Sequence, residues 1–288
     1  DTIKYQLNAR RQPYGQGADL SLLNESVGNE VLAFHQKFPD YRVTPLRKLE
    51  FLSQRLGLGS IHIKDEAQRF GLNAFKGLGG SYAMGKYLAA LLERDINTLS
   101  FAELNSPVIK ARIKDIVFVT ATDGNHGRGV AWAAEQLGLR AVVYMPKGSS
   151  PVRAQNIRRH GAECTITELN YDDTVRLAAK TAREQGWVLL QDTAWQGYEQ
   201  IPTWIMQGYM TLAVEIWQQL AESGASMPTH LFLQAGVGSF AWCLYLFSSC
   251  PSNFPSPDLV PIHTKPCSSR RIQRTLEGSP SFREICLK

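Results

Sequence analysis

Short apolar runs alternate with amphipathic stretches of helical length through the middle of the chain. Four of these runs predict buried strands: 116–120, 141–145, 163–167 and 187–191. Three predicted helices lie between the strands, and each ends on a glycine: 129–138, 151–161 and 172–186. Strand, helix and strand at this spacing indicate right-handed crossovers, so the pattern predicts a parallel sheet with helices on its faces. Asn170 or Asp172 is the predicted N-cap of the third helix.

The flanking regions give a less regular pattern. Residues 44–59 carry leucines at helical spacing and end on glycines, which predicts a helix, and a short strand is expected at 61–64. A helix over 208–220, a strand over 230–234 and a glycine turn are expected next. The first residues are polar and rich in turn formers, so they predict a loosely packed arm. Beyond Ser239, Pro and Ser interrupt every period, and no element is predicted after Leu246.

Composition excludes several classes of protein. The 288 residues are 44% hydrophobic and 20% charged, as in globular proteins rather than disordered or membrane-bound ones. The net charge of +5 comes from scattered Lys and Arg, and only the region 265–274 is locally basic. We therefore expect neither a nucleic-acid partner nor a membrane partner.

The five cysteines are odd in number and lack metal-ligand spacing, which predicts reduced thiols and no metal site. No leader is visible before the first element, so a cytoplasmic location is the default expectation.

Lys76 is the first candidate for chemistry. It precedes a glycine cluster and a predicted helix in the segment 69–85. The amides and dipole at a helix N-terminus favour anions and disfavour an ammonium, so we expect a neutral, nucleophilic amine. Such an amine can form a Schiff base with an aldehyde cofactor. A solvated lysine on a loop is the alternative.

Two further turns follow predicted strands, where a parallel sheet opens onto its ligand crevice. The first, 120–129, has amides that could hold a carboxylate or phosphate, although Asp123 and Asn125 could also be plain turn and cap residues, with His126 starting the helix. The second, 233–239, is a glycine turn of the kind that binds phosphate. A Rossmann site is its rival, but Ala241 stands where the last glycine of GxGxxG would fall.

The order of lysine, Asn-containing turn and glycine turn resembles that of fold type II pyridoxal-phosphate enzymes, the tryptophan-synthase-like class. The segments FGLNAFKGLGG, TDGNHGRGVAWAAEQLG, YMPKGS, GAECTITELNYDDTVRLAA and QDTAWQGYEQIPTWIMQGY are similar to the diaminopropionate ammonia-lyases. The serine/threonine dehydratases usually carry a Ser before the aromatic residue and the lysine. The resemblance covers about 34–239.

The resemblance implies an α/β fold with two open parallel-sheet domains, the second and larger one incomplete. The implied division has four parts: an arm at 1–40, a large cofactor domain at 41–85 and 205–246, a small α/β domain at 86–204, and a divergent Pro/Ser-rich tail at 247–288. A homodimer is also implied.

The resemblance assigns roles to residues of this chain. Lys76 would bind pyridoxal 5'-phosphate covalently, and Asn125 would hydrogen-bond its phenolic oxygen. Its phosphate would be bound by Gly236, Val237, Gly238 and Ser239. The carboxylate of an amino-acid substrate would be bound by the turn amides around Thr122, Asp123, Gly124 and His126.

The implied reaction is the α,β-elimination of 2,3-diaminopropionate to pyruvate and ammonia. Lys76 would remove the Cα proton from one enantiomer, and Asp123 would be the base on the opposite face. Asp192 would hold the substrate's second amino group, although a buried structural carboxylate is an equal alternative.

The C-terminal part departs from the family. Family members continue with a late segment that contacts the pyridine nitrogen, and 240–288 shows no counterpart to it. Phe240, Trp242 and Tyr245 bring bulk beside the glycine turn, so we expect crowding of the phosphate site. A dehydratase-type enzyme and a catalytically inactive truncated remnant therefore remain as alternatives.

Overall fold

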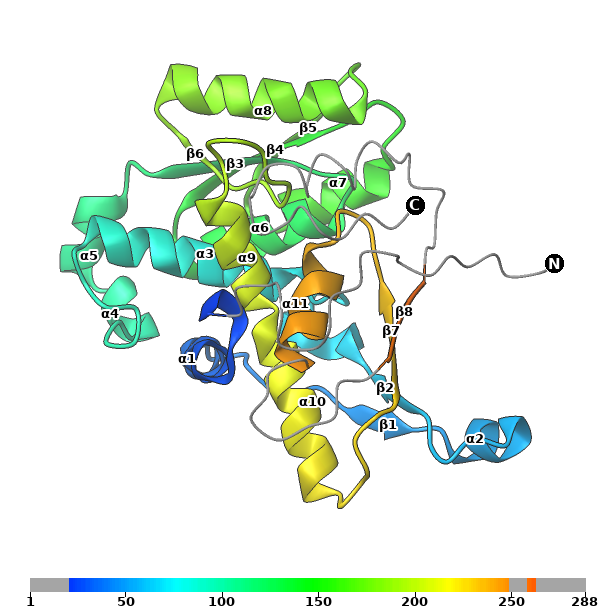
Figure 1. Cartoon of the computed structure of the whole chain (residues 1–288). Coiled ribbons are helices and arrows are strands. Elements are labelled where there is room, and N and C mark those ends of the chain that lie inside the picture. The colour runs from blue at the N-terminus through cyan, green and yellow to red at the C-terminus, as the bar shows by residue number, and fades with distance from the viewer. Residues whose placement is uncertain (1–20, 249–257, 263–288) are drawn as a thin grey trace.

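The computed structural model describes residues 21–248 and 258–262 of the chain (Figure 1). Its main layer is a four-stranded sheet in the order β5-β4-β3-β6. The strands are β3 (Val117–Ala121), β4 (Arg140–Met145), β5 (Glu163–Ile166) and β6 (Val188–Leu189), and all of their pairings are parallel. The parallel sheet that the alternating pattern predicts is confirmed, and each strand begins within one residue of its predicted start.

Helices cover both faces of this sheet (Figure 1). On one face lies α8 (Tyr171–Gln185), whose Ala178 and Ala182 pack with Val117 and Val119 of β3. Phe118 points the other way, into the main core. That core also contains residues of α3 (Lys76–Leu91), α6 (Asn125–Leu137) and α7 (Pro151–Arg158). The alternation along β3 is the period of two expected for a strand that is covered on both faces.

The helix ends follow the sequence signals with two exceptions, the first being that α6 begins at Asn125 rather than at the predicted residue 129. Asn170 caps α8 because its Oδ1 accepts from the amide of Asp173 at 2.9 Å. Gly138 and Gly186 end α6 and α8 with φ of 63° and 67°, a left-handed conformation that glycine adopts without strain. Helix α7 instead ends at Arg159, ahead of the glycine that was predicted to cap it.

Glycine allows α3 and α6 to cross in close contact. A Cβ on Gly129 would lie 2.7 Å from the carbonyl carbon of Lys76 and 2.8 Å from the amide nitrogen of Gly77. No side chain fits there, so the start of α3 rests on the backbone of α6. This contact fixes Lys76 relative to the turn that begins α6.

A second group of helices forms the lower part of the molecule. Helix α9 (Gln200–Gly208) is followed after Tyr209 by α10 (Met210–Glu222), and α1 (Glu25–Gln36) packs against α10. His35 of α1 is buried, and its Nε2 donates to the carbonyl of Leu78 at 3.0 Å while Thr211 Oγ1 lies 2.6 Å from its Nδ1. The expectation of a loosely packed arm is therefore wrong for residues 25–36, because the apolar side of this helix is buried on α10.

The segment 44–64 forms a small antiparallel ribbon rather than starting with a helix. Strands β1 (Leu46–Lys48) and β2 (His62–Lys64) pair with each other, and the segment that connects them contains α2 (Glu50–Leu56). The predicted helix is therefore correct only from Glu50 onward. Leu46 has helical spacing to the later leucines, but its backbone pairs with Lys64, and this long-range pairing overrides the local pattern.

Arg69 anchors a buried ion cluster behind this ribbon. It belongs to the 3-10 helix η2 (Glu66–Gly71), and its Nη2 lies 2.7 Å from Oε2 of Glu215 on α10. Lys64 Nζ is also 2.7 Å from that oxygen, and Arg69 Nε is 2.8 Å from Oε2 of Glu66. Two cations and two carboxylates therefore balance each other where solvent is excluded.

Strand β7 (His230–Gln234), the glycine turn and α11 (Ser239–Ser248) come last in the continuous part. Helix α11 buries Cys243 and Phe247 in the main core. Strand β8 (Asp258–Ile262) pairs in parallel with β7, although the sequence pattern predicts no element there. The sequence pattern did not predict this strand because it contains a proline. Proline cannot donate a hydrogen bond to a neighbouring strand and is tolerated only on an edge strand, so it argues against a strand assignment.

The remaining elements are short connections: η1 (Ser21–Leu23), α4 (Phe101–Leu104) and α5 (Pro107–Ile113). Within the ranges that the structure describes, none of the helices combines the length and apolar character needed to cross a membrane. The basic stretch 265–274 lies outside the described residues.

Candidate active site

Lys76 is the first residue of α3, and its side chain is enclosed by aromatic rings. The ammonium nitrogen lies 5.7 Å from the ring centroid of Phe75 and 5.3 Å from that of Tyr209. Its side chain is 18% exposed, so the amine does not face bulk water. The alternative of a solvated loop lysine is therefore wrong.

Asp192 follows β6 and forms an ion pair with Lys76. Its Oδ2 lies 3.0 Å from Lys76 Nζ, and its side chain is only 8% exposed. Burial alone would raise the pKa of Asp192, but the Lys76 ammonium, which donates a hydrogen bond to the carboxylate, outweighs this effect and holds that pKa below its usual value. Asp192 is therefore ionised, and it is the counter-ion of Lys76.

The charge state of Lys76 differs from the sequence expectation. Burial disfavours the ammonium, but the Tyr209 phenol and the Asp192 carboxylate outweigh this effect and hold the pKa of Lys76 above its usual value. The expected neutral amine is therefore wrong for the chain by itself. The reason is a through-space contact with Asp192, which local reasoning on the helix dipole could not include.

His126 lies beside the same carboxylate, in the first turn of α6. Its Nε2 donates a hydrogen bond to the carbonyl of Leu190 at 2.8 Å. Its Nδ1 lies 3.8 Å from Asp192 Oδ2 and has no hydrogen-bond partner in the described part of the chain. Burial lowers the pKa of His126 and, with the Lys76 charge, outweighs the raising effect of the Asp192 carboxylate, so the ring is neutral and carries its proton on Nε2.

The turn that begins α6 uses part of its hydrogen-bonding capacity internally. Thr122 Oγ1 accepts from the amides of Gly124 at 2.9 Å and Gly127 at 3.1 Å, and the amide of Thr122 donates to Tyr144. The amides of Thr122 and Gly124 are therefore not available for a substrate carboxylate, contrary to expectation. The amides of Asp123, Asn125 and His126 have no protein acceptor within the described residues, so a carboxylate could bind there.

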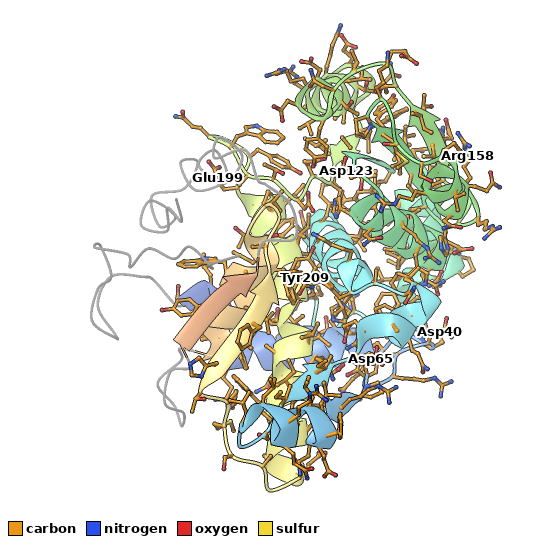
Figure 2. The ribbon with its side chains drawn as sticks, turned by 90° about the vertical axis from the view of Figure 1, so that its right-hand side faces the viewer. Asp40, Asp65, Asp123, Arg158, Glu199 and Tyr209 are labelled. Carbon is orange, nitrogen blue, oxygen red and sulfur yellow. The ribbon has the colours of Figure 1, made fainter. Side chains whose placement is uncertain are left out.

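Asp123 and Asn125 are exposed at the mouth of this turn. Arg153 donates to the backbone carbonyl of Asp123 at 3.1 Å. No hydrogen bond or ion pair of the Asp123 carboxylate occurs within the described ranges. Figure 2 shows Asp123 beside the four-stranded sheet and Tyr209 at the centre of the molecule. The structure thus brings Lys76, Asp192 and His126 together, while Asp123 and Asn125 are exposed on the turn that begins α6.

The glycine turn between β7 and α11 adjoins the start of α3. The ring of Phe240 packs against Phe75 at 4.3 Å and Tyr209 at 6.0 Å between centroids. These are the two rings that flank Lys76. A Cβ on Gly236 or Gly238 would meet no atom within 4 Å, so space remains above the turn.

Ser239 tests whether this turn fits a phosphate group. It begins α11, and its Oγ is buried without a hydrogen-bond partner. A hydroxyl at a helix N-terminus beside open glycines suits phosphate oxygens, which accept hydrogen bonds only. The residues present therefore fit the cofactor that the resemblance implies. The predicted crowding by Phe240 stays a prediction, because that ring packs among the rings beside Lys76.

Buried polar atoms without partners gather around this site. Four of those in the described ranges belong to its residues: His126 Nδ1, Thr193 Oγ1, Tyr209 Oη and Ser239 Oγ. Such atoms are rare in folded proteins because each costs about 1–3 kcal/mol. Their concentration around one buried lysine indicates a place where a polar ligand binds.

Two tyrosines shape the site through contacts that the local sequence does not specify. Tyr209 flanks Lys76, and Tyr198 donates from its hydroxyl to Leu189 and accepts from the amide of Gln191, both at 2.8 Å. Tyr198 thereby fixes the segment that leads into Asp192. Neither tyrosine has a local signal in the sequence, since both act through contacts between distant elements.

A family model described as "Pyridoxal-phosphate dependent enzyme" matches residues 37–281. The chain is 71% identical over 269 residues to the diaminopropionate ammonia-lyase of Salmonella typhimurium, covering 93% of this chain and 67% of that protein. It is 52% identical to the enzyme of the same name from Escherichia coli, covering 78% of this chain and 55% of that protein. These matches confirm the resemblance that the sequence segments indicate, but its expected extent of about 34–239 is too short, because the family model reaches residue 281.

A solved structure gives the same relationship in three dimensions. The Escherichia coli diaminopropionate ammonia lyase "in complex with aminoacrylate-PLP azomethine reaction intermediate" superposes with a TM-score of 0.77 and 46% identity. The match covers 89% of this chain and 62% of that chain. The chain thus spans between about half and two thirds of the length of these relatives.

Proposed function

This chain belongs to the pyridoxal-phosphate dependent enzymes and, within them, to the diaminopropionate ammonia-lyases, and we propose that it binds pyridoxal 5'-phosphate at Lys76 and eliminates ammonia from 2,3-diaminopropionate. The observation that carries the proposal is the buried Lys76–Asp192 pair, accompanied by unpartnered polar atoms, of which His126 Nδ1 and Ser239 Oγ come from the predicted turns. A structural ion pair alone would not leave these neighbouring atoms unsatisfied.

The residues of the chain divide the work of binding. Ser239 and the turn of Gly236, Val237 and Gly238 hold the cofactor phosphate, and Asn125 hydrogen-bonds the cofactor's phenolic oxygen. The amides of Asp123, Asn125 and His126 hold the substrate carboxylate. When bound, the cofactor supplies an electron sink for the carbanion at Cα.

The chain's side chains then move the proton and orient the leaving group. Once the substrate's α-amino group has displaced it from the cofactor, Lys76 would be a free neutral amine and would take the proton from Cα. The freed electron pair then forms the Cα–Cβ double bond, and the Cβ–N bond breaks with its pair to release ammonia. Asp192 keeps the leaving amine protonated, because a buried carboxylate stabilises an adjacent ammonium. Asp123 is the base for the opposite enantiomer. Hydrolysis of the unsaturated product gives pyruvate and a second ammonia.

A dehydratase acting on serine or threonine is the alternative within the same fold. Asp192 favours the diamino acid, because a buried carboxylate pairs with an ammonium and has no matching charge on a hydroxyl. Ammonia release from 2,3-diaminopropionate and from serine, measured side by side, decides between them.

Cofactor binding is tested by mixing the full chain with pyridoxal phosphate, reducing with borohydride and mapping the label by mass spectrometry. We expect the label on Lys76 and none in Lys76→Ala. Lys86→Ala is the matched control, because Lys86 lies on the same helix and pairs with Glu30 at 3.7 Å. Failure to bind the cofactor, or a label elsewhere, would contradict the proposal and favour an inactive remnant.

We also propose a homodimer, a cytoplasmic location and a division into a large cofactor domain at 41–85 and 205–246 and a small α/β domain at 86–204. The family resemblance supports the dimer and the domains. Light scattering of the purified chain tests the dimer, and a monomer at micromolar concentration would contradict it.

A further inference from the structure

Asp192 and Tyr209 lie beside the ammonium group of Lys76, and His126 lies beside the Asp192 carboxylate. Asp192 Oδ2 is 3.0 Å from Lys76 Nζ and 3.8 Å from His126 Nδ1. The Tyr209 ring centroid is 5.3 Å from the same Nζ, and burial raises the pKa of its phenol to about 12 while the charges of Lys76 and Asp192 also act on it. The Tyr209 hydroxyl therefore faces the ion pair.

The tautomer of His126 is fixed by its surroundings. The Leu190 carbonyl can only accept, so the 2.8 Å contact places the ring proton on Nε2. Nδ1 then presents a lone pair, and it is buried with no donor reaching it from the described residues. A bare acceptor next to a buried carboxylate is unfavourable unless a cationic donor lies between them.

An ammonium ion satisfies this arrangement because it has three N–H donors for three acceptors. Lys76 supplies the cation in the chain by itself, but its amine is consumed when it binds the cofactor aldehyde. Asp192 then loses its cation, and His126 Nδ1 lacks a donor from the described residues already in the chain by itself. The second ammonium of a diamino acid is a primary ammonium of the same kind as the Lys76 group that occupies the site here.

We propose that the side chain of His126, through its unprotonated Nδ1, is a specificity-determining acceptor that completes with Asp192 and Tyr209 a subsite for a primary ammonium group. This inference rests on the proposed function and names the part of the site that selects the leaving group. A hydroxyl in the same place offers one donor and leaves two buried acceptors unpaired, so the subsite discriminates against hydroxy amino acids.

The subsite can be tested without cofactor or turnover. Lys76→Ala removes three carbons and the ammonium, and n-propylammonium has the same atoms. We expect n-propylammonium to raise the melting temperature of the full-length Lys76→Ala chain, and 1-propanol, its neutral counterpart, to have no effect. Equal effects of the two compounds would overturn the proposal.

The role of His126 is tested in the same background. His126→Gln keeps an N–H that can reach the Leu190 carbonyl but removes the Nδ1 acceptor, so n-propylammonium binding should weaken about tenfold or more. His160→Gln is the control, since His160 is a histidine beside Glu135 at 2.8 Å, away from this site. Unchanged affinity in His126→Gln would refute the role of Nδ1.

A measurement on the unmodified chain tests the proposal without depending on how well these variants fold. Nitrogen NMR at neutral pH should show that the ring signal which is lost in His126→Gln belongs to a ring with a proton on Nε2 and an unprotonated Nδ1, while His35, whose Nε2 also donates to a carbonyl, keeps a signal of the same kind. A ring protonated on Nδ1, or on both nitrogens, would overturn the proposal. Cofactor labelling of Lys76 is a separate experiment, so the failure of one idea is distinguishable from the failure of the other.

Discussion

Lys76 Nζ and Asp192 Oδ2 lie 3.0 Å apart although 116 positions separate them in the chain. Lys76 begins α3, and Asp192 follows β6, the edge strand of the four-stranded sheet. The pair therefore joins the helical part of the molecule to the sheet. It also sets the protonation state of the lysine on which the proposed chemistry depends.

Removing the carboxylate should lower the pKa of the lysine. In Asp192→Asn, burial acts on the Lys76 amine without the opposing charge, so the pH midpoint for its acetylation should fall. Competitive labelling with acetic anhydride, read by mass spectrometry, measures this midpoint. Asp65→Asn, which removes the exposed partner of Arg47, is the control and should leave it unchanged. An unaltered midpoint in Asp192→Asn would mean that the pair does not govern the amine.

A methyl group at the crossing of α3 and α6 should separate the two helices. In Gly129→Ala the new Cβ would lie 2.7 Å from a backbone carbon of Lys76, which cannot move aside alone. Overpacking of this kind costs about 1–3 kcal/mol. Urea unfolding should show this loss, together with slower cofactor labelling of Lys76. Gly59→Ala is the control because no atom lies within 4 Å of its Cβ, and equal stability of the two variants would contradict the close crossing.

The buried ion cluster should be sensitive to the loss of one member. Arg69→Met leaves Glu215 with Lys64 as its cation and leaves Glu66 without the cation that it pairs with here. Breaking a buried ion pair costs about 3–5 kcal/mol of stability. The free energy of unfolding in urea measures the cost. Lys147→Met removes an exposed pair with Glu168 and should change stability by less than about 1 kcal/mol. Similar losses in both variants would show that burial of the cluster is unimportant.

Acid should destabilise the chain partly through His35. Burial, aided by the charge of Arg69, lowers the pKa of His35 from 6.5 to about 3. The unfolded chain therefore takes up the proton first as pH falls, so stability is lost from about pH 6.5 down to about pH 3, by at most about 1.4 kcal/mol per pH unit. Urea titrations at pH 7 and pH 5 measure this loss. His35→Gln should show a shallower dependence on pH, and an identical slope would count against the assignment.

The sequence predicted the four-stranded sheet and its helices well, because the signals for these elements are local. Apolar runs of strand length, the cap residue Asn170 and the left-handed glycines at 138 and 186 all act within a few positions of the element they define. The pattern was misleading at Leu46, where strand pairing with Lys64 outweighs helical spacing. It also missed α1, whose buried side is apparent only when α10 lies against it.

The sequence by itself determined the alternating α/β order, the family and the segments from which the site is built, because each is written in short runs of neighbouring residues. The tertiary structure alone decided the charge of Lys76, the bare Nδ1 of His126 and the position of Tyr209. These depend on burial and on distances between residues far apart in the chain. Electrostatic energy and desolvation vary with such distances, which local sequence patterns do not specify.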